Sequence, residues 1–116
     1  MKMRSKTTLR TYGLTEETFT ALYKAQNGCC AICGISEAEL EKRHSGPDDW
    51  ASDRVLHIDH DQDSSPVRVR GLLCWRCNFD LEAFIRNRPV IHPKRRGVSL
   101  PRNDPRFEKY LRRTQA

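Results

Sequence analysis

Two histidines, two aspartates and a glutamine occur between His57 and Gln62, in the stretch LHIDHDQ at residues 56–62. Carboxylate oxygens bind hard divalent cations, and an imidazole can take a proton from water, so this composition is typical of a metal-assisted hydrolytic site. It is equally typical of a solvated turn. These seven residues do not distinguish the two, and the surrounding sequence has to be considered.

The cysteines flank this stretch as two Cys-x-x-Cys hooks, CAIC (Cys30, Cys33) and CWRC (Cys74, Cys77), separated by 40 residues. Each hook presents two thiolates, and two hooks complete a closed tetrahedral site that is typical of structural zinc. Alternative interpretations are two redox dithiols or unrelated buried cysteines. A fifth cysteine, Cys29, could replace Cys30 as a ligand, although the x-x spacing favours Cys30.

The composition predicts one small domain. The chain has 116 residues, 37% of them hydrophobic, so its core is modest and a metal would supplement the packing. An odd number of cysteines suits a secreted disulfide framework poorly. We find no apolar run of about 18 residues and no signal-peptide pattern in MKMRSKTTLR, and therefore expect a cytoplasmic protein without membrane contact.

The net charge of +6 is unevenly distributed. Residues 1–12 carry +4, residues 86–116 carry +8 and residues 13–85 carry −6. Cationic ends around an acidic centre favour a polyanion held over divalent cations, which indicates DNA as the partner. Basic tails are common, so this pattern alone does not decide the function.

Three helices are predicted from their capping residues. Thr15 is the expected N-cap of a helix that Gly28 terminates, and Ser36 that of a short helix ending near Arg43. After the linker at residues 89–103, Asp104 is the expected N-cap of a last helix. That helix carries Phe107, Tyr110 and Leu111 on one face, which we expect to pack on the domain.

Between the hooks, residues 54–60 and 67–74 predict two strands of a hairpin, and a helix is expected over residues 78–88, before Pro89 stops it. If one zinc joins the hooks, this helix folds back over the hairpin. Asp59 and His60 then face Asn78, with Glu82 one turn further along. Aspartate and asparagine oxygens suit Mg²⁺ or Mn²⁺, and His60 could act as a base.

Each of these residues also has a purely structural interpretation. Asn78 could be the N-cap of its helix, and Asp59 with His60 could form a hydrogen-bonded surface pair. His57 could be a strand histidine satisfied by a neighbour. The joint pattern favours the metal site over these separate explanations.

Four segments, YGLTEETF, QNGCCAICG, LHIDHDQ and VRGLLCWRCN, closely resemble the recombination endonuclease VII family of HNH nucleases. The resemblance covers residues 12 to about 88. It implies an α+β fold with a ββα-metal (His-Me finger) core, a Cys₄ structural zinc and flanking helices. We accordingly expect a basic N-terminal arm (1–11), an HNH endonuclease core (12–88) and a basic linker with a short C-terminal helix (89–116).

The resemblance also implies roles for matching positions. Asp59 and Asn78 match the catalytic metal ligands, His60 matches the general base, and the structural zinc site matches Cys30, Cys33, Cys74 and Cys77. Gln62 departs from the pattern, because family members usually have a second histidine there. His57 could partly replace it if the strand brings it round, and Glu82 is a further auxiliary candidate.

The function we expect is metal-dependent hydrolysis of DNA phosphodiester bonds, nicking or cutting duplex DNA to leave 5′-phosphate and 3′-hydroxyl ends. Arg68, Arg70 and Arg76 are expected to flank the cleft, and Lys94, Arg95 and Arg96 to contact backbone phosphates. Alternatives are a Holliday-junction or branched-DNA resolvase and a non-catalytic zinc-containing DNA-binding module. We expect a monomer or weak homodimer that, if phage-encoded, acts in the host cytoplasm.

Overall fold

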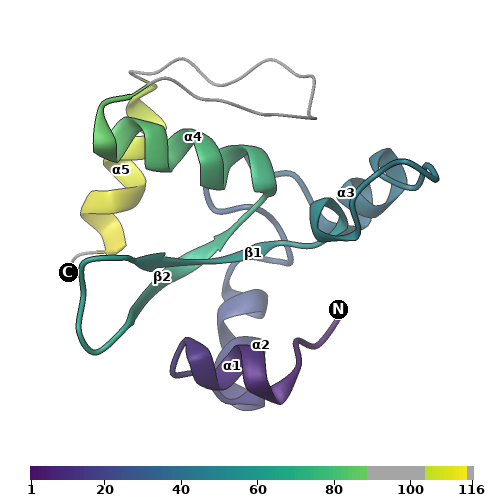
Figure 1. Cartoon of the computed structure of the whole chain (residues 1–116), viewed down its shortest axis with the longest axis horizontal. Coiled ribbons are helices and arrows are strands. Elements are labelled where there is room, and N and C mark those ends of the chain that lie inside the picture. The colour runs from purple at the N-terminus through teal and green to yellow at the C-terminus, as the bar shows by residue number, and fades with distance from the viewer. Residues whose placement is uncertain (89–103, 115–116) are drawn as a thin grey trace.

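Helices and one two-stranded antiparallel sheet make up the computed structural model, which describes residues 1–88 and 104–114. In chain order the elements are α1 (Lys6–Thr11), α2 (Glu16–Ala25), α3 (Glu37–Arg43), the 3-10 helix η1 (Ala51–Arg54), β1 (His57–Asp61), β2 (Arg68–Leu73), α4 (Trp75–Arg86) and α5 (Pro105–Thr114). Figure 1 shows α4 and α5 on one side of the sheet and α1 and α2 on the other. The predicted mixed fold with one hairpin is confirmed.

The predicted N-caps account for three of the helices. The Thr15 hydroxyl accepts a hydrogen bond from the Thr18 amide at 3.1 Å, and Ser36 accepts one from the Glu39 amide at 3.1 Å. The Asp104 carboxylate accepts one from the amide of Arg106 at 2.9 Å. Each cap satisfies an amide that has no partner inside its helix, so local sequence decides where these helices begin.

Residues 6–11, which the sequence assigns to a basic arm, form helix α1. Ser5 caps this helix, and Leu9 is buried in the core. Residues 1–12 carry four basic residues, so their charge predicts an exposed arm and gives no sign that Leu9 is buried. The division into arm, core and C-terminal part stays a prediction.

Helix α4 begins at Trp75, three residues before the predicted start at Asn78. The N-cap is Cys74, whose sulfur accepts a hydrogen bond from the Cys77 amide at 3.5 Å. The second cysteine hook therefore forms the first turn of the helix. Asn78 is not an N-cap, and its own amide donates to the Cys74 carbonyl at 2.9 Å.

The sheet contains an irregularity at the predicted catalytic residues. Asp59 pairs with Gly71, whereas the next residue, His60, pairs with Val69, so Arg70 has no opposite residue on β1. Arg70 is thus the extra residue of a β-bulge. Bulges re-aim side chains, and here the Arg70 guanidinium turns toward the carboxylate of Asp59.

The hydrophobic core lies between the sheet and the helices on both sides. Its buried members are Leu9, Phe19, Cys30, Ile32, Leu40, Leu56, Leu72, Leu73, Cys74, Trp75, Cys77, Leu81, Phe107 and Tyr110. Phe107 and Tyr110 belong to α5, which confirms that this helix packs on the domain. Of the helices in the described ranges, none has the length and apolar character needed to cross a membrane.

An ion pair between Arg4 and the buried Glu37 holds the start of the chain beside β1. Glu37 accepts hydrogen bonds from Arg4 at 3.1 Å and from the Leu56 amide at 3.0 Å. Arg4 also donates to the Leu56 carbonyl at 2.8 Å. Because a buried carboxylate must be paired and hydrogen-bonded, this set of contacts fixes residues 2–4 next to the strand that follows Leu56.

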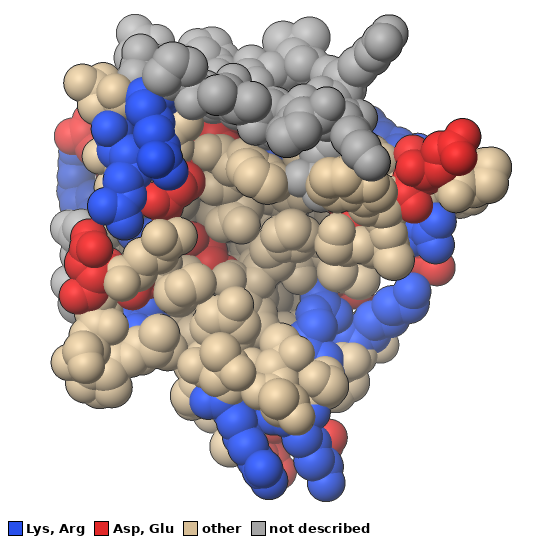
Figure 2. Space-filling view, viewed as in Figure 1, with Lys and Arg blue, Asp and Glu red and all other residues tan. Residues whose placement is uncertain are grey.

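Charged side chains surround a largely uncharged centre on the face seen in Figure 2. Lys and Arg side chains gather toward the edges of this face, including the edge formed by α1 and α2.

The four predicted zinc ligands meet in one cluster. The sulfur atoms of Cys30, Cys33, Cys74 and Cys77 all lie within 4.8 Å of one another. The Cys33 and Cys74 sulfurs are 3.7 Å apart. Two ligands of a tetrahedral Zn–S site, with bonds of about 2.3 Å, are about 3.8 Å apart, so the cluster has the dimensions of a zinc site. Cys29 lies outside this group.

The surroundings of the cluster also suit zinc. Hydrogen bonds among the four thiols lower the pKa of Cys33 and raise the pKa values of Cys74 and Cys77, because closely spaced thiolates disfavour one another's ionisation. The amide of Ala31 donates to the Leu72 carbonyl at 3.1 Å, which ties the first hook to the strand leading into the second. Four thiolates together need a cation, and the residues present could bind zinc.

Replacing one cluster member should remove both zinc and stability. Zinc bound by thiolates contributes roughly 10 to 16 kcal/mol in zinc-finger peptides, about as much as the net stability of a whole domain. We therefore expect Cys77→Ser to contain no stoichiometric zinc and to show no cooperative thermal transition. Metal analysis and circular dichroism melting measure the two effects.

The matched control is Cys29→Ser, which changes a neighbouring cysteine outside the cluster and should keep one zinc per chain and the parental melting temperature. A Cys77→Ser protein with full zinc and an unchanged transition would contradict the assignment of the cluster.

Candidate active site

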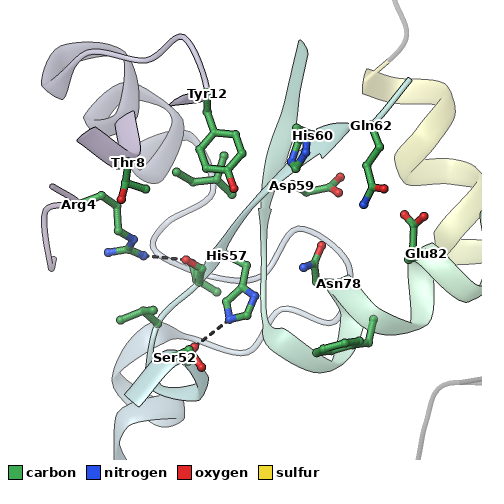
Figure 3. Close-up of a pocket in the computed structure, with 14 residues that line it drawn as sticks. Arg4, Thr8, Tyr12, Ser52, His57, Asp59, His60, Gln62, Asn78 and Glu82 are labelled. Carbon is green, nitrogen blue, oxygen red and sulfur yellow. Dashed lines mark hydrogen bonds between the residues drawn. The ribbon is translucent and has the colours of Figure 1, made fainter. Parts of the chain in front are cut away.

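A cavity of about 370 Å³ runs along β1 between α1 and the first turns of α4 (Figure 3). It is lined by Arg4, Thr8, Tyr12, Ser52, Val55, Leu56, His57, Ile58, Asp59, His60, Gln62, Asn78, Phe79 and Glu82. This list contains all three predicted catalytic residues and all three auxiliary candidates. The structure therefore brings them together around one hollow.

Asp59 is a buried carboxylate held by two residues. The Arg70 Nε donates to its Oδ2 at 2.9 Å, and the Arg70 Nη2 donates to its Oδ1 at 3.0 Å. The Tyr110 hydroxyl donates to the same Oδ2 at 2.8 Å. The Asp59 residue is 4% exposed, so its orientation is fixed by these bonds.

The Tyr110 hydroxyl acts as a donor because its pKa is raised above the ordinary value. Burial is the main cause, followed by the charge of Asp59. Loss of the phenolic proton would place a second negative charge against the carboxylate in a site with little water. Tyr110 consequently stays protonated and gives its hydrogen to Asp59.

His60 lies beside an aromatic ring from α1. The centroids of the His60 and Tyr12 rings are 4.9 Å apart, with an angle of 50° between the planes. The His60 carbonyl accepts a hydrogen bond from Arg70 Nη2 at 3.1 Å, which anchors the backbone at this point. Tyr12 thus limits the positions of the imidazole at the cavity wall.

Asn78 approaches from the first turn of α4. Figure 3 shows its amide group pointing into the cavity on the side of Asp59. Within residues 1–88 and 104–114, the side chains of Asn78 and His60 make no hydrogen bond. Both groups are therefore available to a bound water, ion or phosphate.

Two of the three auxiliary candidates, His57 and Glu82, hydrogen-bond to neighbouring residues. His57 Nε2 donates to the Ser52 carbonyl at 2.8 Å, and Figure 3 shows it at the other end of the cavity from Gln62. His57 therefore does not take the position of Gln62. Glu82 accepts a hydrogen bond from Arg86 at 2.7 Å while lining the cavity.

The arginines expected beside the cleft lie outside its lining. Arg68 donates to the Thr114 carbonyl at 2.8 Å and lies 3.4 Å from Asp61. The Arg70 side chain is 7% exposed in its pair with Asp59, which leaves little of it for DNA. Arg76 is half-buried on α4. Lys94, Arg95 and Arg96 lie outside the described residues.

The sequence did not identify two tyrosines that contact the site. In the sequence, Tyr12 is only the first residue of the segment YGLTEETF, and Tyr110 is one residue of an apolar helix face. A tyrosine on such a face carries a hydroxyl that needs a partner when buried, and this was the available signal for Tyr110. The partner itself, 51 residues away, is visible only in the fold.

Asp59 keeps a free acceptor site toward the cavity that a divalent ion could use. A carboxylate offers about four acceptor sites. Asp59 Oδ2 accepts two hydrogen bonds and Oδ1 accepts one, so one site remains on Oδ1. This oxygen and the amide oxygen of Asn78 are hard ligands, which fits Mg²⁺ or Mn²⁺ with water and phosphate completing the shell.

Two curated relatives come from mycobacteriophages. The chain is 31% identical over 97 residues to the Gene 59 protein of Mycobacterium phage D29, covering 84% of this chain and 48% of that protein. It is 33% identical over 70 residues to the Gene 59 protein of Mycobacterium phage L5, covering 60% and 34%. The chain thus spans half or less of each relative's length. No solved structure shows a significant match.

A family model extends over nearly the whole chain. The model described as recombination endonuclease VII matches residues 5–112, which include the cysteine cluster, the cavity and helix α5. The expected resemblance is confirmed: this chain belongs to the recombination endonuclease VII family.

Proposed function

We propose that this protein is a metal-dependent endonuclease of the HNH type that hydrolyses DNA phosphodiester bonds. In this proposal β1, β2 and α4 form the ββα-metal core. The observation that carries the proposal is that Asp59, His60 and Asn78 line one cavity although they come from two separate elements. Membership of a family described as an endonuclease supports it.

Each residue has a role that its surroundings allow. His60, without a hydrogen-bond partner in the described ranges, takes a proton from the attacking water. Asp59 Oδ1 and Asn78 would hold a divalent ion. Bound there, such an ion supplies Lewis-acid stabilisation of the scissile phosphate and the departing 3′ oxygen. The products are 5′-phosphate and 3′-hydroxyl ends.

Duplex DNA is the substrate that we propose, nicked or cut on both strands. A second candidate is a four-way or branched junction, favoured by the description of the matching family as a recombination endonuclease. Labelled duplex and four-way junction oligonucleotides of equal length separate the two, because a resolvase would cut the junction in preference. A phage origin like that of the relatives would place this reaction in the host cytoplasm.

A zinc-containing DNA-binding module without activity is the rival from another class. Such a module would have no need for an unoccupied aspartate lone pair, a free imidazole and a free amide around one hollow. Incubation of supercoiled plasmid with Mg²⁺ or with EDTA distinguishes the two, since a binding module leaves the plasmid intact in both.

His60→Ala should abolish cleavage and preserve DNA binding. General-base catalysis typically contributes 10²- to 10⁴-fold, so the rate of plasmid nicking should fall by about that factor. The imidazole is not expected to contact the DNA backbone in the ground state, so gel-shift affinity in EDTA should be unchanged. Nicking rates in Mg²⁺ or Mn²⁺ give the measurement.

The control for this variant is His44→Asn. His44 lies outside the cavity and accepts a hydrogen bond from Trp75 Nε1 at 3.2 Å, which an asparagine oxygen can replace. This protein should cut at the parental rate. Parental cleavage by His60→Ala would show that another group deprotonates the water.

DNA affinity should fall steeply with salt, and the basic linker should contribute to the slope. If Lys94, Arg95 and Arg96 each contact a phosphate, replacing all three with alanine should reduce the slope of log K against log salt by about 2.7, since each neutralised phosphate contributes about 0.9. Fluorescence anisotropy at several salt concentrations measures the slope.

Arg43→Ala serves as the comparison, because Arg43 is an exposed cation already paired with Glu39 at 3.0 Å. It should leave the slope unchanged. An unchanged slope in the triple variant would remove the linker from the DNA-binding surface.

A further inference from the structure

The C-terminal helix reaches the candidate active site through a single side chain. Tyr110 of α5 is 2% exposed, and its hydroxyl donates to Asp59 Oδ2 at 2.8 Å. Arg70 holds the same carboxylate from β2 through two hydrogen bonds. Asp59 is therefore fixed from two elements, one of which lies beyond the hairpin and α4 in the chain.

The contacts of Asp59 with Arg70 and with Tyr110 differ in charge. Arg70 supplies the positive charge that a buried carboxylate requires, but the same charge weakens the attraction of Asp59 for a divalent ion. Tyr110 is a neutral donor, so it can orient the carboxylate without adding repulsion. Its bond occupies the last acceptor site of Oδ2 and leaves the free site on Oδ1.

The sheet has space for this hydroxyl because of a glycine. Gly71 is the cross-strand partner of Asp59, and a Cβ atom placed on it would lie 2.8 Å from the Tyr110 hydroxyl oxygen. Real Cβ atoms essentially never come so close to another atom, so a larger residue at position 71 would press against the Tyr110 hydroxyl and, at 3.1 Å, against Gln26 Oε1. The backbone is thus shaped to admit the Tyr110 contact.

We propose that Tyr110 is a positioning residue that orients Asp59 for divalent-ion binding, so that helix α5 is part of the metal site. This inference rests on the proposed function of Asp59 as a ligand. Residues that hydrogen-bond metal ligands typically change metal affinity or activity 10- to 100-fold when mutated. The Tyr110 hydroxyl is such a group.

Tyr110→Phe removes the hydroxyl and keeps the ring in the core. We expect the dissociation constant for Mn²⁺ on the zinc-loaded chain, followed by electron paramagnetic resonance, to rise roughly 10-fold. The Mn²⁺ concentration for half-maximal plasmid cleavage should rise by the same factor, and excess Mn²⁺ should restore the rate. DNA binding in EDTA should not change.

Two controls separate positioning from general weakening of the fold. Tyr23→Phe removes a hydroxyl from a partly buried tyrosine of α2. Leu111→Ala removes apolar packing from α5 and leaves the hydrogen bond to Asp59 intact. Both should bind Mn²⁺ with parental affinity. If Leu111→Ala weakens binding as much as Tyr110→Phe, the role is structural and the inference is wrong.

The other possible results distinguish failure of this inference from failure of the proposed function. Parental Mn²⁺ affinity in Tyr110→Phe overturns the inference while leaving the proposed function intact. Weaker Mn²⁺ binding in that variant, with no DNA cleavage by the parental chain, overturns the proposed function and supports the inference. Absence of Mn²⁺ binding by the parental chain overturns both. If Tyr110→Phe does not fold, Gly71→Ala, which presses against the same hydroxyl, should give the same loss of affinity.

Discussion

The meeting of four cysteine sulfurs determines where the other parts of the site can lie. The two hooks flank the hairpin in sequence, so bringing them together closes the hairpin between them. Cys74 is both a member of the cluster and the N-cap of α4, which sets the point from which the helix starts. Asn78 follows one turn later, and its height above β1 is consequently set by the cluster. A small core could not hold this geometry by packing alone.

The same electrostatic arrangement occurs at Leu56, just before β1, and at Asp59 in the middle of β1. Glu37 and Asp59 are buried carboxylates, and each is paired with an arginine, Arg4 near the start of the chain or Arg70 on the neighbouring strand. Burying an ion pair costs desolvation energy, so these pairs specify geometry more than they add stability. The two sites differ in their third contact. Glu37 receives a backbone amide and is structural, whereas Asp59 receives a tyrosine hydroxyl and keeps one acceptor site.

The sequence predicts those features that depend on neighbouring residues. The N-caps at Thr15, Ser36 and Asp104 need one side chain and an amide two or three residues away, and all three are found. The spacing within each hook predicts a metal-binding pair, and the joint pattern predicts that Asp59, His60 and Asn78 share a cavity.

Features that depend on distant contacts were not predictable in this way. The bulge at Arg70 has no local signature, so the sequence predicted an arginine flanking the cleft rather than one paired with Asp59. Helix α1 depends on Leu9 reaching a core built by later residues. The contact of Tyr110 with Asp59 requires that α5 return to β2, and nothing near either residue encodes that path.

The flanking helices are therefore part of the site rather than additions to it. The motifs recognised in the sequence end near residue 88, but the family match continues from residue 5 to residue 112. That range contains α1, which places Tyr12 against His60, and Tyr110, which holds Asp59. His60 and Asp59 are thus each contacted by a helix from a different end of the chain, while Asn78 lies on the helix that starts at the cysteine cluster. An isolated two-stranded sheet is only marginally stable, so the positions of these three side chains depend on the helices and on the cysteine cluster.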